Sequence, residues 1–103
     1  MNSWDIASVI IAKYKDKVEE EVFNDLRKAF EDVRSADADA RRQKTKADII
    51  RMARLKIELG KFQRSYAKLK TDTGSIVAID KIISEVQTKI KLISYNKNKK
   101  KVT

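Results

Sequence analysis

The chain has 103 residues and a net charge of +9, with 38% charged residues, two Gly and no Pro, Cys or His. This is the length of one domain, and the scarcity of turn residues predicts an all-α bundle of three long helices, or four if the first is broken. Without Cys or His, the usual ligands of zinc, iron–sulfur clusters and haem and the commonest acid–base group are missing, so we expect no cofactor, no metal and no enzyme activity.

The first segment, residues 3–33, has apolar residues at steps of three and four, the spacing of an amphipathic helix. Ser3 is the expected N-cap. Asp16 and Glu19 form a D-x-x-E capping box, so the segment is either one long helix or two shorter ones. The apolar stretch before Lys13 lacks the pattern of a secretory signal and is far shorter than a membrane span. Together with the absence of Cys, this favours an intracellular protein without membrane insertion.

The same segment carries an acidic cluster, which consists of Glu19, Glu20, Glu21, Asp25, Glu31 and Asp32. The cluster either pairs with a later basic helix or is a solvated face, and the second interpretation is favoured because exposed ion pairs contribute only about 0–1 kcal/mol. Residues 35–44 lose the apolar period and predict a loop or a frayed helix end. Asp37 and Asp39 lie in this stretch, but an isolated pair of short acids binds magnesium only weakly.

A second helix is predicted from Thr45, which forms a capping-box variant with Asp48, to residue 70. One apolar row alternates steps of three and four and predicts a coiled-coil-like packing edge; it consists of Met52, Leu55, Leu59, Phe62, Tyr66 and Leu69. A second row on another face predicts a second neighbouring helix; it consists of Ile50, Ala53, Ile57 and Gly60. Gly60 costs roughly 1 kcal/mol relative to Ala inside a helix, so either another backbone approaches it closely or the loss is tolerated.

A turn is predicted at residues 71–75, where Gly74 can adopt a positive φ. The third helix follows, and its apolar row again alternates steps of three and four; the row consists of Ile76, Ile79, Ile83, Val86, Ile90 and Ile93. β-branched residues at nearly every position suit an oligomer interface, although a bundle within one chain would use the same pattern. We therefore expect a self-associating helical domain over residues 1–94 and a basic disordered tail over residues 95–103.

The positive charge is concentrated in the second helix: residues 41–70 contain eleven Lys or Arg against two acids, whereas residues 1–40 contain six against ten. The bases in this helix form a ridge roughly 20 Å long, which is either a solvated face or a surface that follows several phosphates. Basic residues at the helix start, where the dipole favours acids, weigh toward binding. The predicted nucleic-acid-binding set, with DNA favoured over RNA, is Arg41, Arg42, Arg54, Lys61, Arg64, Lys68, Lys97, Lys99, Lys100 and Lys101.

Three stretches resemble the α-helical domain of the GINS family of replication proteins. An E-E-x-F-x-x-L stretch lies at Glu20–Leu26, an R-L-K-I stretch at Arg54–Ile57 and an apolar–acidic helix at Ile79–Glu85, in the order of that family. GINS subunits are non-catalytic proteins that assemble as tetramers and link the helicase ring to its partners, so the resemblance implies a replication accessory role. The alternative is a protein adaptor of viral or plasmid type, whose basic face docks an acidic protein.

Overall fold

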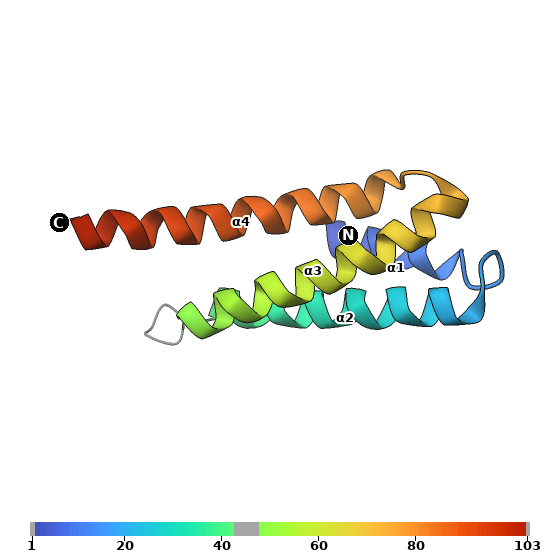
Figure 1. The fold of residues 1–103 in the computed structure, drawn as a ribbon, viewed down its shortest axis with the longest axis horizontal. Helices are drawn as coiled ribbons and strands as arrows, with labels where there is room; N and C mark the ends of the chain where they lie inside the picture. Colours follow the sequence, from blue (N-terminus) through green and yellow to red (C-terminus); the bar gives the residue numbers. More distant parts are fainter. Residues whose placement is uncertain (1, 43–47, 103) are drawn as a thin grey trace.

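The structure is a computed structural model that describes the backbone of residues 2–42 and 48–102 and the side chains of residues 2–40 and 50–92. Within these ranges the chain forms four helices and no strand, so the all-α prediction is confirmed. The helices are α1 (Ser3–Ala12), α2 (Glu20–Arg42), α3 (Asp48–Thr73) and α4 (Val77–Val102) (Figure 1). The fold is elongated, with extents of 53 × 25 × 21 Å.

The first predicted helix is broken, so the alternative of two shorter helices is correct. α1 ends at Ala12, the chain turns through residues 13–18, and α2 begins at Glu20. The N–H of Phe23 donates to the carbonyl of Glu19 at 3.0 Å, which closes the first turn of α2. Asp16 and Glu19, the residues of the predicted capping box, therefore lie in the break between the two helices, just before α2 begins.

Asn2, rather than Ser3, caps α1. The side-chain oxygen of Asn2 accepts a hydrogen bond from the N–H of Asp5 at 2.9 Å, which satisfies one of the backbone donors left free at a helix start. The hydroxyl of Ser3 donates instead to Glu85 on α4 at 3.1 Å. Asn2 and Ser3 thus connect the start of α1 to its own first turn and to α4.

The stretch predicted as a loop or frayed end after residue 34 is helical as far as Arg42, so the loop prediction is wrong there. Ala36 is fully buried and Asp37 is 3% exposed, because this end of α2 still packs against neighbouring helices. Small apolar residues continue the helical spacing from Val33 through Ala36 to Ala40. The proposed cap at Thr45 lies outside the described residues.

α3 continues three residues beyond its predicted end and stops at Gly74. The φ of Gly74 is +75°, the left-handed conformation that ends many helices, and its N–H donates to the carbonyl of Lys70 at 2.9 Å. The hydroxyl of Thr73 donates to the carbonyl of Leu69 at 3.1 Å. The bond from Gly74 satisfies a carbonyl of the last helical turn, and the chain then reverses into α4.

The helices pack as antiparallel neighbours: α2 lies along α3, α3 turns back into α4, and the short α1 lies against α4 (Figure 1). Aromatic rings connect three of them, because Phe30 of α2 lies 5.6 Å from Trp4 of α1 and 5.8 Å from Phe62 of α3, between ring centroids. Rings at these distances and tilts add to the apolar burial that stabilises the core.

The α3 row lies in this core: Leu55, Leu59, Phe62, Tyr66 and Leu69 are buried, and Met52 is half-buried. In the α4 row, Ile76, Ile79 and Val86 are buried and Ile83 and Ile90 are half-buried, while the side chain of Ile93 lies outside the described residues. Ile82, which is off this row, is fully buried because α4 contacts both α1 and α3 and needs a wider apolar stripe.

α4 continues as a helix to Val102, whereas the sequence predicts a disordered tail from residue 95. Its last turns extend along the long axis past the near ends of α2 and α3 (Figure 1). None of the helices in the described part of the chain has an apolar run long enough to span a membrane.

Candidate nucleic-acid interface

The predicted basic ridge lies on the solvent side of α3. Arg54, Lys61, Arg64 and Lys68 are all exposed, because the buried row of α3 faces α2 and α4 and turns these positions outward. A regular helix of 26 residues carries them, so their spacing is fixed by helix geometry. The surface that contains these four residues is called the basic ridge below.

Arg54 lies at the edge of the ridge and is already engaged within the chain. Its guanidinium donates to the carboxylate of Asp39 on α2 at 2.5 Å, and both side chains remain partly exposed. This contact ties the start of α3 to the end of α2. A charge-assisted hydrogen bond of this kind leaves less positive charge for a ligand, so Arg54 is the weakest member of the ridge for binding.

The ion pair with Asp39 shows that the Arg54 side of α3 borders α2. Lys61 and Lys68 follow Arg54 at steps of seven residues and lie on the same side of the helix. Lys61 lies 3.7 Å from Glu58 on its own helix.

Arg64 and Lys68 form no ion pair with another described residue. Arg64 lies on the outward side of the helix, farther from α2 than Arg54 and Lys61. The outward cations of the ridge are therefore available to a ligand, and the inner edge is shared with α2.

α3 contacts two helices, α2 and α4, as predicted, but both pack near its first apolar row, and the second row does not make the second contact. Ile50 is 74% exposed and Ile57 is 58% exposed, and both lie on the same side of α3 as the ridge. A Cβ added to Gly60 would meet only the Arg64 guanidinium at 3.7 Å, so no backbone of this chain approaches Gly60 closely.

Asp37 and Asp39 join helices rather than forming a loop site for magnesium. Lys89 of α4 donates to the carboxylate of Asp37 at 2.9 Å and to its carbonyl at 3.3 Å, while Asp39 bonds Arg54 of α3. Residues two apart on a helix point in widely different directions, so each acid reaches a different neighbour. Among the residues with described side chains, no group of acids is arranged to hold a metal ion.

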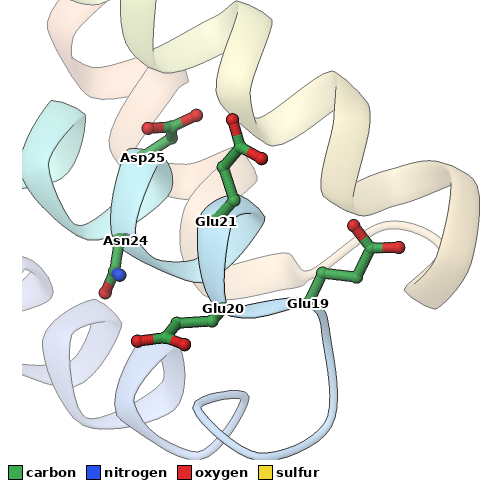
Figure 2. Close-up of a pocket in the computed structure, with 5 residues that line it drawn as sticks. All are labelled: Glu19, Glu20, Glu21, Asn24 and Asp25. Atoms are coloured by element: carbon green, nitrogen blue, oxygen red, sulfur yellow. The ribbon is translucent and has the colours of Figure 1, made fainter.

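The start of α2 forms a shallow acidic hollow, lined by Glu19, Glu20, Glu21, Asn24 and Asp25 (Figure 2). The carboxylates point in different directions: Glu20 points away from Glu21 and Asp25, and Glu19 points to a third side. The hollow therefore has no point at which the acids converge on a ligand. Glu31, later in the cluster, bonds Arg27 on its own helix at 3.2 Å. The arrangement favours the solvated-face interpretation.

Tyr66 has a polar role that its place in an apolar row does not reveal. Its hydroxyl accepts from the N–H of Ile76 at 2.7 Å and donates to Asp80 at 2.8 Å, which joins α3 to the first turn of α4. Burial raises the pKa of the Tyr66 phenol above its ordinary value of 10.0, and the hydrogen bond to Asp80 adds to the increase. The phenol thus remains neutral and serves as a structural donor and acceptor.

The auxiliary positions of the predicted binding set are located only by their backbone. Arg41 and Arg42 end α2, and Lys97, Lys99, Lys100 and Lys101 lie in the last turns of α4. Their side chains lie outside the described residues. They stay predictions, and the described part of the interface is the ridge on α3.

No protein-family model, no curated protein and no solved structure matches this chain. The resemblance to the GINS family therefore stays a prediction that depends on the three short stretches named above.

Proposed function

We propose that this chain is a non-enzymatic intracellular protein of nucleic-acid transactions, of the accessory type that the GINS resemblance implies. It binds the phosphate backbone through the basic ridge of α3, with DNA favoured over RNA. One observation supports this above the others: Lys61, Arg64 and Lys68 are exposed together on one regular helix, and the last two form no ion pair with another described residue. Such a row of cations is attracted to phosphates and displaces their counterions.

Binding of this kind is largely independent of sequence. The ridge presents charge without the paired amide or guanidinium groups, held at a groove, that read base edges. It also has no exposed aromatic ring for stacking on unpaired bases. A short duplex and a scrambled duplex of equal length are therefore expected to bind with similar affinity.

The test is a titration with duplex DNA, RNA and heparin at several salt concentrations. The variant Lys61→Gln, Arg64→Gln, Lys68→Gln should bind more weakly, and its salt slope should fall by about 0.9 for each lost contact with duplex DNA. The matched control is Lys81→Gln with Lys91→Gln, which neutralises exposed lysines of α4. Equal affinity and slope for the ridge variant and the unaltered chain would show that the ridge is a solvated face.

Association with other chains completes the proposal, either as a homo-oligomer or as one part of a complex. Support comes from apolar side chains that this chain leaves exposed on α1 and α3, among them Val9 at 50% and Ile50 at 74%. The α4 row that first suggested an oligomer is largely used inside the chain. Light scattering that gives a mass near 11.9 kDa, together with no binding to any added protein or peptide, would contradict association.

A second candidate function is an adaptor that docks an acidic protein through the same helix. The exposure of Ile50 and Ile57 favours it, because aliphatic side chains gain from contact with another apolar surface and gain little from phosphates.

A further inference from the structure

The outer side of α3 changes in character along the helix. Its first half presents Ile50, Ala53 and Ile57, whereas three of the four cations of the basic ridge, Lys61, Arg64 and Lys68, lie in its second half. Ile50 and Ile57 are seven residues apart, so they lie on one side of the helix about 10 Å from each other. We call Ile50, Ala53, Ile57 and Gly60 the outer apolar row.

Gly60 leaves room beside the row that no backbone of this chain occupies. A glycine in a helix interior is unfavourable relative to Ala, yet a Cβ here would meet only the Arg64 guanidinium at an ordinary contact distance of 3.7 Å. The fold therefore does not need a glycine at this position. Ala53 lies seven residues earlier on the same side, so two small residues leave room for a second helix to lie close to α3.

Positive charge on both sides of the row restricts the partner. Arg54 and Lys61 lie along one edge and Lys56 lies along the other, all exposed. Two copies of this surface placed face to face would bring like charges together, which is unfavourable. Duplex DNA would contact these cations but would leave Ile50 and Ile57 without an apolar surface to cover them.

We propose that the outer apolar row docks an acidic amphipathic helix of another protein. The partner helix places aliphatic side chains over Ile50 and Ile57, and its Asp or Glu residues along both edges face Lys61 and Lys56. The small residues Ala53 and Gly60 let the two backbones approach. This inference rests on the second candidate function and deepens it, because it identifies the partner as an acidic amphipathic helix and centres the contact on the outer apolar row rather than on the basic ridge.

The probe is a synthetic helical peptide with Leu on one side and Glu on both flanks, titrated into the full chain. The unaltered chain should bind it, and the variant Ile50→Ser, Ile57→Ser should lose about tenfold or more in affinity, because two exposed aliphatic contacts are removed. Gly60→Leu should weaken binding as well by blocking close approach. Val77→Ser is the matched control, since Val77 is an 81% exposed apolar residue on α4, and it should bind like the unaltered chain.

Three results would overturn the inference. The first is no binding of the acidic peptide, or equal binding of a peptide with Lys in place of Glu. The second is unchanged peptide affinity in the double Ser variant, whose helical circular dichroism should match that of the unaltered chain. The third is loss of self-association in that variant, which would identify a second copy as the partner. Duplex DNA separates the two proposals: the double Ser variant should retain DNA affinity, whereas the triple Gln variant of the ridge should lose it.

Discussion

The two ends of α2 carry similar numbers of acids but use them differently. At the start of the helix, Glu20, Glu21 and Asp25 are exposed, and Glu20 points away from the other two. Near its end, Asp37 is 3% exposed and accepts from Lys89 of α4, and Asp39 accepts from Arg54 of α3. An acid stabilises this fold when a cation from another helix reaches it. A carboxylate that is removed from water needs such a partner to offset the loss of its hydration.

The largest effect should come from the buried pair. Replacing Lys89 with Met removes one charged partner of Asp37, 2.9 Å from its carboxylate, and we expect a loss of about 1.5–3 kcal/mol in the free energy of unfolding, as for a hydrogen bond between charged groups. Urea unfolding followed by circular dichroism measures it. Lys91→Met is the matched control, since Lys91 is exposed on the same helix, and it should change stability little. Equal losses in the two variants would show that the pair contributes no more than an exposed charge.

Tyr66→Phe should have the next largest effect. The variant leaves the N–H of Ile76 without its acceptor in a buried site, which costs about 1–3 kcal/mol. The pKa of the Tyr66 phenol in the folded protein is raised above the ordinary value of 10.0. The phenol therefore contributes its full stabilisation below the pKa that it has in the unfolded chain, and this stabilisation is lost as the pH rises through the folded pKa. The stability difference between the unaltered chain and the variant should therefore narrow above about pH 10.

Phenolate absorbance in an alkaline titration gives an independent measurement of that pKa. The unaltered chain should show a phenol that ionises above pH 10.0 and that Tyr66→Phe removes. If the titration curves of the two proteins differ only by a phenol of ordinary pKa, the hydroxyl of Tyr66 is not buried in solution.

Much of the fold is predictable because the spacing of apolar residues directly encodes helical geometry. Phe62, Leu69 and Ile79 were placed in apolar rows on that basis, and all three are buried. The helix over residues 35–42 is indicated only by the small residues Ala36 and Ala40, which continue the helical spacing but are too weakly apolar to stand out among the neighbouring Asp and Arg residues.

The contacts of the charged side chains were not predictable in the same way. Asp37 and Lys89 are 52 positions apart, and their contact depends on how α2 and α4 pack, which no local pattern specifies. The exposure of Ile50 and Ile57 has the same origin, because a second apolar row looks equally suited to a neighbour within the chain or outside it. Only the arrangement of the helices shows that both neighbours of α3 lie elsewhere.

Replacing each of the two glycines with Ala should change the stability of the fold by a smaller amount, and in opposite directions. Gly74 has φ of +75°, so Gly74→Ala should destabilise the fold by about 1 kcal/mol. Gly60 is in a regular helix, and an added Cβ would meet only the Arg64 guanidinium at an ordinary contact distance of 3.7 Å, so Gly60→Ala should stabilise the fold by about 0.5–1 kcal/mol. Thermal unfolding of both variants measures these shifts. A destabilising effect of Gly60→Ala would show that this part of α3 is packed more closely than the structure indicates.

The smallest effect should come from the exposed pair that joins α1 to α2. Arg34 donates to the carboxylate of Asp5 at 2.9 Å, and this hydrogen bond lowers the pKa of Asp5 below 3.8. Because the folded pKa is lowered, the contribution of the pair is present above the unfolded pKa and is lost as pH falls through the folded pKa. Arg34→Gln should therefore unfold slightly more readily than the unaltered chain near neutral pH, and the stabilities of the two proteins should converge as the pH falls below the ordinary pKa of an Asp side chain, about 3.9.

Arg27→Gln is the control, since Arg27 pairs only within α2, and acid titrations of unfolding compare the three proteins. If Arg34→Gln and Arg27→Gln behave alike at every pH, the pair between Arg34 and Asp5 adds no more to stability than an ion pair within α2.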